Sequence, residues 1–289
     1  MLPAPHFFEF PSIRLGAERL AGLLAEVLPE GHPWQLHVES DYGSGRAGQH
    51  RCQLIREALD ERLTRTRRHL LRHRRKEAAP FTPEDSLVQV LLDAPDQGWV
   101  SVALAPLPYV QRCVISPFPL GEIEPASDKT APSRAFAKLI EAECRLGRKI
   151  AAGETCVDLG ACPGSWTYVA VKRGATVIAV DRSPLRADLW CEPRVTFHSG
   201  DAFSFIPDRR VDWLLCDVIA APERSMKLLL DWAVERRMRH FVVTIKFRGD
   251  AAYPQLDFLK QRLLPVCTDF FLSRLNANKN EACAFGTLR

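Results

Sequence analysis

The segment Thr155–Trp166, which reads Thr-Cys-Val-Asp-Leu-Gly-Ala-Cys-Pro-Gly-Ser-Trp, constrains the fold of this chain more than any other segment. A short apolar run comes first, the glycines at 160 and 164 follow, and a stretch compatible with a helix comes next. This order predicts a buried strand, a tight turn and a helix start. Glycines at such a turn let the backbone approach a ligand, and open α/β sheets bind ligands at strand ends. The segment is therefore predicted to be a cofactor loop.

Downstream of this loop, short apolar runs alternate with helical patterns. The predicted strands cover residues 155–159, 176–180, 195–197, 213–216, 241–245, 269–272 and 282–285. Such regular alternation predicts an α/β fold with a mostly parallel, doubly wound sheet. Connections of this kind place the carboxyl ends of the strands along one edge, so the residues that follow each strand are expected to converge there.

The acids and the proline around the loop indicate which cofactor it binds. Asp181 lies about 20 positions after Gly160, the separation at which an acid reaches ribose hydroxyls in a nucleoside site. The Gly-x-Gly-x-x-Gly pattern is absent, and Pro163 removes a backbone N–H that a pyrophosphate would need. S-adenosylmethionine, a sulfonium nucleoside without phosphate, therefore fits better than NAD. Asp201, after the third strand, is expected to meet the adenine amino group.

Two residues are predicted to end adjacent central strands, namely Asp217 and Lys246. A lysine that closes a buried strand indicates a carboxylate nearby, because burying an ammonium without a partner is costly. A second cation would favour the neutral amine, which is the form that acts as a base. Lys138, in a helical pattern that resumes at Ser133, could supply this cation, and Glu281 at the start of the last strand could complete the set. Taken alone, a lysine in such a helix is usually a surface charge.

Six motifs occur in the order found in FtsJ-type (RrmJ-like) RNA ribose 2′-O-methyltransferases. They are Ser-Arg-Ala-Phe-Ala-Lys-Leu, Asp-Leu-Gly-Ala-Cys-Pro-Gly-Ser-Trp, Val-Asp-Arg-Ser-Pro, Gly-Asp-Ala-Phe, Leu-Leu-Cys-Asp-Val-Ile and Thr-Ile-Lys-Phe. Over residues 132–289 the chain resembles this family, and most closely its members that act on 23S rRNA. Two departures are Ser165, where a second glycine is common, and Pro222, which stands later than the usual proline after the Asp217 motif.

The resemblance implies a Rossmann-like methyltransferase sheet with one antiparallel strand near the C-terminus, and S-adenosylmethionine-dependent methylation of a ribose 2′-hydroxyl in RNA. It implies a catalytic tetrad of Lys138, Asp217, Lys246 and Glu281, in which Lys246 deprotonates the hydroxyl. The expected cofactor contacts are Ser133, Asp158, Gly160, Cys162, Pro163, Gly164, Ser165, Trp166, Asp181, Asp201 and Asp217.

The N-terminal part carries a run of basic residues, called here the basic run, on a helix predicted to pass through Ile55 and Leu70. Its members are Arg62, Arg65, Arg67, Arg68, Arg72, Arg74, Arg75 and Lys76. A solvated helix face is the common meaning of a charge run, but a single-signed, arginine-rich run favours contact with an RNA backbone. The order helix, strand, basic helix, strand, strand over residues 15–107 resembles a THUMP domain, an RNA-binding module.

These observations predict a THUMP-like α+β domain at residues 1–110, a proline-rich linker at 111–131 and a methyltransferase domain at 132–289. The nine cysteines show no Cys-x-x-Cys pair, so we expect buried thiols in a reducing compartment and no metal site. No long apolar stretch indicates a membrane span, and a cytoplasmic monomer or weak dimer is expected.

Two other functions compete with this interpretation. A catalytically silent RNA-binding or ribosome-assembly factor could keep the same fold, although all four residue types of the tetrad are present. An NAD-dependent oxidoreductase would share the acid at 181, but the missing glycine pattern disfavours it.

Overall fold

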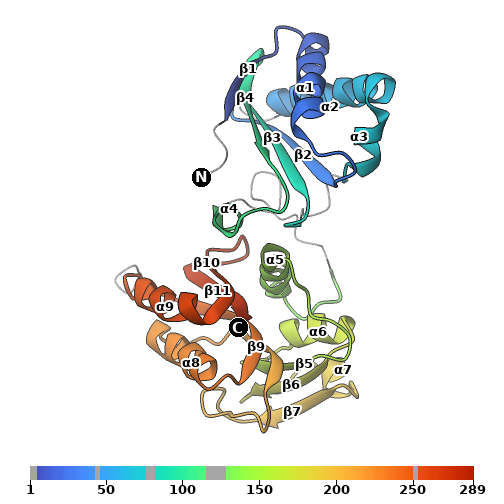
Figure 1. Ribbon diagram of the computed structural model, residues 1–289. Coiled ribbons are helices and arrows are strands. Elements are labelled where there is room, and N and C mark those ends of the chain that lie inside the picture. The colour runs from blue at the N-terminus through green and yellow to red at the C-terminus, as the bar shows by residue number, and fades with distance from the viewer. Residues whose placement is uncertain (1–4, 43–45, 76–81, 115–127, 250–252) are drawn as a thin grey trace. The chain divides into compact units, whose positions relative to one another are not determined.

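A computed structural model describes residues 5–42, 46–75, 82–114, 128–249 and 253–289 (Figure 1). Contacts between residues divide the chain into two units, residues 1–123 and 124–289. Helix α4, Tyr109–Val114, covers the start of the predicted linker, and residues 115–127 lie outside the described residues. Each unit has its own hydrophobic core.

The N-terminal unit is built on a four-stranded sheet in the order β1-β4-β3-β2. Its strands are β1 (His6–Glu9), β2 (Trp34–Ser40), β3 (Ser86–Ala94) and β4 (Gln97–Ala103). Strands β2 and β3 pair in parallel, and the other neighbours are antiparallel. Helices α1 (Ile13–Val27), α2 (Arg46–Thr66) and α3 (Arg68–His73) lie on one side of this sheet (Figure 1). Strand β1 was not predicted, because its four residues carry no clear alternation of polar and apolar side chains.

The basic run does not lie on one helix, so that prediction is wrong. Helix α2 ends at Thr66, and Arg67 adopts a non-helical conformation before α3 begins. The break lets Leu70 join the core, where its carbonyl accepts a 2.8 Å hydrogen bond from the indole of Trp34. An unbroken helix was predicted because the apolar spacing of three and four residues continues across the break.

The C-terminal unit is built on a seven-stranded sheet in the order β10-β11-β9-β8-β5-β6-β7. Its strands are β5 (Thr155–Leu159), β6 (Thr176–Asp181), β7 (Val195–Ser199), β8 (Val211–Cys216), β9 (Met238–Lys246), β10 (Cys267–Ser273) and β11 (Glu281–Leu288). Strand β11 is antiparallel to both β9 and β10, and all other neighbours are parallel. The prediction of a mostly parallel sheet with one antiparallel strand near the C-terminus is confirmed.

Helices cover both faces of this sheet (Figure 1). They are α5 (Phe136–Leu146), α6 (Ser165–Lys172) and α7 (Ala187–Trp190) on one side, and α8 (Pro222–Val234) and α9 (Gln255–Leu263) on the other. The chain leaves the central strand β5 for β6 and β7 and then crosses back to β8 on the other side. A crevice for ligands is expected where the strand order reverses in this way, at the carboxyl ends of β5 and β8.

The cysteines are more exposed than predicted. Five are buried, but Cys113, Cys162 and Cys191 are exposed, and the expectation of buried thiols is wrong for these three. Cys162 lies in the loop after β5 and Cys191 follows α7, where no apolar layer covers them. In the described part of the chain, no helix is long and apolar enough to cross a membrane, and no group of three metal-ligating side chains occurs.

Candidate active site

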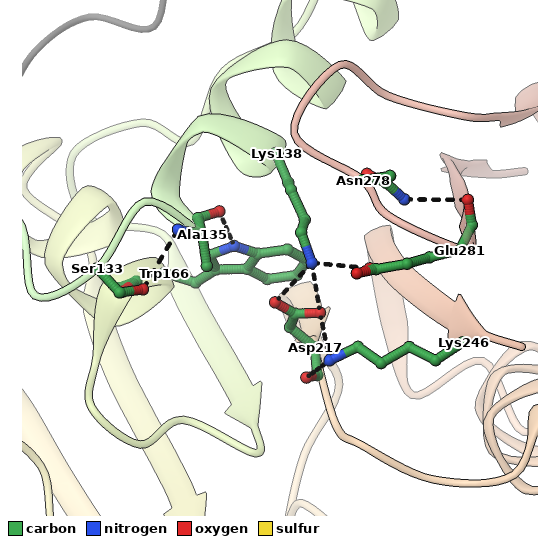
Figure 2. Close-up of polar contacts among 9 residues, drawn as sticks. Ser133, Ala135, Lys138, Trp166, Asp217, Lys246, Asn278 and Glu281 are labelled. Carbon is green, nitrogen blue, oxygen red and sulfur yellow. Dashed lines mark hydrogen bonds and ion pairs between the residues drawn. The ribbon is translucent and has the colours of Figure 1, made fainter. Parts of the chain in front are cut away.

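The four residues of the predicted tetrad come together at the carboxyl edge of the C-terminal sheet (Figure 2). The Lys138 amine donates to both carboxylate oxygens of Asp217 at 3.1 Å and to Glu281 Oε2 at 2.8 Å. The Lys246 amine donates to the backbone carbonyl of Asp217 at 2.8 Å and lies 3.1 Å from its Oδ1. Two cations and two carboxylates therefore form one connected cluster.

The fold explains why residues so distant in sequence meet. Asp217 directly follows β8, and Lys246 ends the neighbouring strand β9. Glu281 begins β11 and stands opposite Lys246 in the antiparallel register. Lys138 reaches the group from helix α5. Three strand ends and one helix thus each supply one charged side chain.

Burial and charge act in opposite directions on Lys138. Its residue is only 6% exposed, and burial by itself lowers the pKa of an ammonium. The charge of Asp217 and the hydrogen bond and charge of Glu281 outweigh this effect, and the pKa of Lys138 is raised above its ordinary value. The amine of Lys138 is therefore held in its protonated form.

The loop after β5 needs glycine at both of its glycine positions. Gly160 has φ +76°, and a Cβ there would lie 2.5 Å from a methyl carbon of Val218. Gly164 has φ +107°, and its Cβ would lie 2.4 Å from a methyl carbon of Leu189. The backbone N–H of Gly160 donates to the carbonyl of Val180 on β6 at 2.8 Å, which closes the turn against the sheet. At both glycine positions the loop therefore approaches a neighbouring segment more closely than any residue with a Cβ could.

A cavity lies between this loop, the residues just before α5 and Asp217 of the tetrad. Its lining residues are Ser133, Ala135, Asp158, Gly160, Ala161, Cys162, Pro163, Ser165, Trp166 and Asp217. Eight of the predicted cofactor contacts are in this set, whereas Gly164, Asp181 and Asp201 are not. Ala135 and Ala161 were not predicted, because an alanine carries no chemical signal in a sequence.

Asp158 is hydrogen-bonded to Thr167 in helix α6, which follows the loop. Its Oδ2 accepts hydrogen bonds from the backbone N–H and the hydroxyl of Thr167, at 2.9 and 2.7 Å. Burial raises the pKa of Asp158 to about 7. Because Thr167 is in the first turn of α6, this carboxyl fixes the helix that follows the loop. The resemblance implied that this carboxyl contacts the cofactor; it lines the cavity, and its hydrogen bonds go to the helix.

Asp181 at the end of β6 and Asp201 after β7 are already bound to other groups of the protein. Asp181 accepts from the backbone N–H groups of Cys162 at 3.0 Å and Ser183 at 2.9 Å. A carboxylate can accept about four hydrogen bonds, so Asp181 keeps capacity for ribose hydroxyls. Asp201 Oδ2 lies 3.5 Å from Arg182 and 3.7 Å from Arg224. Both arginines would have to share Asp201 with an adenine amino group.

The segment before α5 is fixed against helix α6 by contacts that the sequence did not reveal. Asp128 accepts hydrogen bonds from the hydroxyl of Tyr168 at 2.7 Å and the amine of Lys172 at 2.9 Å. Further along, the Ser133 hydroxyl lies 2.7 Å from that of Ser165. The indole of Trp166 donates to the carbonyl of Ala135 at 2.9 Å (Figure 2).

These contacts hold residues 133–135 in a turn, so α5 begins at Phe136 and not at Ser133, where the helical pattern was predicted to resume. Asp128 follows a proline-rich stretch and matches no motif, and no sequence signal could have found it.

Several members of the basic run bind acids within their own unit. Arg62 pairs with Glu18 at 2.6 Å, Arg75 with Asp85 at 3.3 Å, and Arg74 with Asp60. Arg65 lies 3.8 Å from Glu61, with both side chains largely exposed. Within the described ranges, the members without an ion-pair partner are Arg67, Arg68 and Arg72, and Lys76 lies outside those ranges. The run is thus a mixture of paired and unpaired cations.

With this fold and site, the C-terminal unit has the architecture of a Rossmann-like methyltransferase. Residues 131–263 match the model of the family described as FtsJ-like methyltransferase. Over these residues the chain is similar to that family, as the six motifs predicted.

Relatives with assigned names extend the similarity beyond this domain. The chain is similar to proteins named ribosomal RNA large subunit methyltransferase M. It is 36% identical to the protein of Pseudoalteromonas translucida (strain TAC 125). The alignment covers 51% of this chain and 44% of that protein. It is 30% identical over 72% of its length to that of Azoarcus sp. (strain BH72), of which it covers 58%.

A third relative of this name, from Halorhodospira halophila (strain DSM 244 / SL1), is 32% identical over 80% of this chain and is covered over 62% of its own length. Because the C-terminal unit is little more than half of the chain, this last alignment extends into the N-terminal unit. The chain spans about half the length of the curated relatives it matches.

Proposed function

We propose that this protein methylates a ribose 2′-hydroxyl of RNA with S-adenosylmethionine as methyl donor, and that its substrate is 23S rRNA, as in RlmM-type enzymes. The observation that carries the proposal is the connected cluster of Lys138, Asp217, Lys246 and Glu281 beside the loop cavity of an FtsJ-like methyltransferase domain. The names of the relatives support an rRNA substrate.

The contacts of the two lysines differ, and the difference supports the role of each. Lys138 donates to two carboxylates and is held protonated, so it cannot accept a proton. Lys246 contacts the carboxylate and the carbonyl of Asp217 alone among the described residues, and its side chain is 21% exposed. Lys246 would therefore take the proton of the ribose hydroxyl, and Lys138, Asp217 and Glu281 would position it.

The residues of the loop fit a nucleoside without phosphates. Pro163 leaves the loop with one N–H fewer, and the acids at its rim suit hydroxyl and amino groups better than a pyrophosphate. The lining of the cavity, from Ser133 to Trp166, would hold the cofactor, with Asp181 and Asp201 at its ribose and adenine ends. When bound, S-adenosylmethionine would supply an electrophilic methyl group. Asp217 lines this cavity and also binds both lysines, so it joins the cofactor and acceptor sides.

The N-terminal unit has an RNA-binding role in this proposal. It is proposed to be THUMP-like and to place unpaired arginines of the basic run against the phosphate backbone. We also propose that the N-terminal domain ends at residue 110 and the methyltransferase domain begins at 132. The protein is proposed to be cytoplasmic and to be a monomer or weak dimer.

The test incubates the full chain with deproteinised rRNA and labelled S-adenosylmethionine and then maps the modified position. We expect 2′-O-methyl transfer, and we expect Lys246→Ala to lower its rate by about 10²–10⁴-fold, the usual contribution of a general base. Lys227→Ala is the matched control, because Lys227 forms an exposed pair with Asp231 on helix α8.

Three outcomes would contradict the proposal. They are a methyl group found on a base, transfer that is unchanged in the Lys246 variant, and cofactor binding by calorimetry without transfer to any RNA. The last outcome would favour the silent RNA-binding factor.

A further inference from the structure

The two sides of the carboxyl edge of the C-terminal sheet differ in how their exposed cations are paired. On the β6–β7 side stand Asp181 and Asp201, and the arginines near Asp201 are within ion-pair distance of it. On the β9–β11 side, Arg248 comes two residues after Lys246 and Lys279 two residues before Glu281. Both side chains are exposed, and neither has an ion-pair partner in the part of the chain that the structure describes. Free positive charge is thus concentrated beside the acceptor side of the tetrad.

These two cations lie on adjoining backbone segments. The N–H of Phe247 donates to the carbonyl of Asn280 at 2.9 Å, and the side-chain amide of Asn280 donates to the carbonyl of Gly249 at 2.9 Å. Arg248 and Lys279 therefore project from a hydrogen-bonded pair of segments whose positions are fixed relative to each other. A fixed pair of unpaired cations complements a polyanion that passes the site.

A third feature of this edge is an apolar side chain left in water. Ile219 is 87% exposed, more than any other large hydrophobic residue in the described ranges, and it follows Asp217 by two positions. The two residues before it are held in place, because Val218 packs against Gly160 and the carbonyl of Asp217 accepts a hydrogen bond from Lys246. An aliphatic side chain presented from a fixed loop next to reacting groups is suited to pack against a ligand.

We propose that Ile219, Arg248 and Lys279 form a cradle for the acceptor strand. Ile219 packs against the acceptor nucleoside, and the two cations contact the phosphates that flank it. The tetrad side chains are only 8–21% exposed, so a ribose reaches them only when its nucleotide is turned out of a duplex. The ligand of the cradle is therefore a single-stranded segment of RNA. This inference rests on the proposed function and deepens it.

The experiment compares each cradle residue with a matched residue at the opposite edge of the sheet. Val234, 81% exposed, ends helix α8 and is the control for Ile219. Arg209 precedes β8 by two residues, is exposed and has no ion-pair partner in the described ranges, so it is the control for Arg248 and Lys279. The full chain carries Ile219→Ala, Arg248→Gln or Lys279→Gln, against Val234→Ala and Arg209→Gln.

We expect Ile219→Ala to raise KM for deproteinised rRNA by about tenfold, since burying an aliphatic side chain is worth about that factor. The kcat at saturating RNA and the Kd for S-adenosylmethionine should be unchanged. Arg248→Gln and Lys279→Gln should each reduce the salt dependence of RNA affinity, by a slope of about 0.7 in log K against log salt. The control variants should behave as the wild type.

The cradle is tested separately from the reaction by fluorescence anisotropy with a labelled single-stranded RNA oligonucleotide. If the wild type transfers no methyl group to any RNA, the proposed function fails. Fluorescence anisotropy would still compare the RNA affinities of the cradle and control variants, because it does not depend on methyl transfer. Equal RNA affinity and equal salt slope in cradle and control variants would overturn the cradle, also in an active enzyme. A loss of cofactor affinity in Ile219→Ala would likewise overturn it, because the residue would then belong to the cofactor side.

Discussion

The tetrad and the basic run both depend on cations, but their surroundings differ. In the tetrad, Lys138 and Lys246 share Asp217, and all four side chains are largely buried. In the basic run, Arg67, Arg68 and Arg72 have no ion-pair partner in the described ranges, and other members pair with acids of the same unit at half-exposed positions. Buried cations with fixed partners suit chemistry at one atom, whereas exposed cations suit contact with an extended charge.

The largest effect is expected from Lys138. Lys138→Met leaves the carboxylates of Asp217 and Glu281 without the ammonium that joins them. Removing one partner of a buried charge cluster costs about 3–5 kcal/mol, and urea denaturation should show a decrease of that order in the free energy of unfolding. Lys227→Met, which breaks an exposed pair, should change it by less than about 1 kcal/mol.

A double variant makes this test sharper. Adding Glu281→Gln to Lys138→Met removes one of the stranded charges and should restore part of the lost stability. Equal stability of the Lys138 and Lys227 variants would contradict the difference drawn between buried and exposed pairs.

The next effect concerns the buried carboxyl of Asp158. Its folded-state pKa of about 7 lies above its ordinary value of 3.8, because the site is buried. Between these two values the folded chain keeps a proton that the unfolded chain has lost. The contribution of Asp158 to the free energy of unfolding therefore falls as pH rises, by about 1.4 kcal/mol per pH unit, and is constant above the folded-state pKa.

Asp158→Asn should remove this dependence, because the amide does not titrate. Denaturation at pH 5 and pH 7 measures it as the difference between variant and wild type, in which other titrating groups cancel. The stability of the variant relative to the wild type should increase from pH 5 to pH 7. A difference that is the same at both pH values would mean that Asp158 is ionised throughout.

The smallest effect on stability is expected from the unpaired arginines. Replacing Arg67, Arg68 and Arg72 by Gln should leave the free energy of unfolding within about 0.5 kcal/mol, the usual limit for surface substitutions. It should lower the affinity for RNA and reduce the salt slope by about 2, if each arginine contacts one phosphate of a single strand.

The matched control replaces the paired members Arg62, Arg74 and Arg75 by Gln. We expect it to lower stability more than RNA affinity, since these side chains bind Glu18, Asp60 and Asp85. Fluorescence anisotropy at several salt concentrations measures both sets. If the two triple variants lose RNA affinity equally, the arginines that form ion pairs within the unit contact RNA as much as the others do.

The sequence determined the elements of the C-terminal unit and the edge at which the site forms. Strand β5 was predicted at its observed bounds, because five apolar-rich residues before a glycine turn have few alternatives. Asp217, Lys246 and Glu281 could be predicted to lie close together, because they follow, end or begin neighbouring strands whose ends meet at one edge. Lys138 comes from helix α5, and the family resemblance was what placed it with them.

The tertiary structure decided what surrounds each charge. Hydrophobic periodicity reports which face of an element is buried, and it contains nothing about partners that are distant along the chain. Only the fold shows that Asp158 binds Thr167 and that the basic run is interrupted at Arg67. It also shows that Arg74 is paired, whereas Arg72 has no ion-pair partner in the described ranges. The same limit applies to Ile219, whose residue type predicts burial and whose position on a fixed loop leaves it exposed. Exposure and pairing depend on contacts across the whole unit, and a local sequence pattern does not encode them.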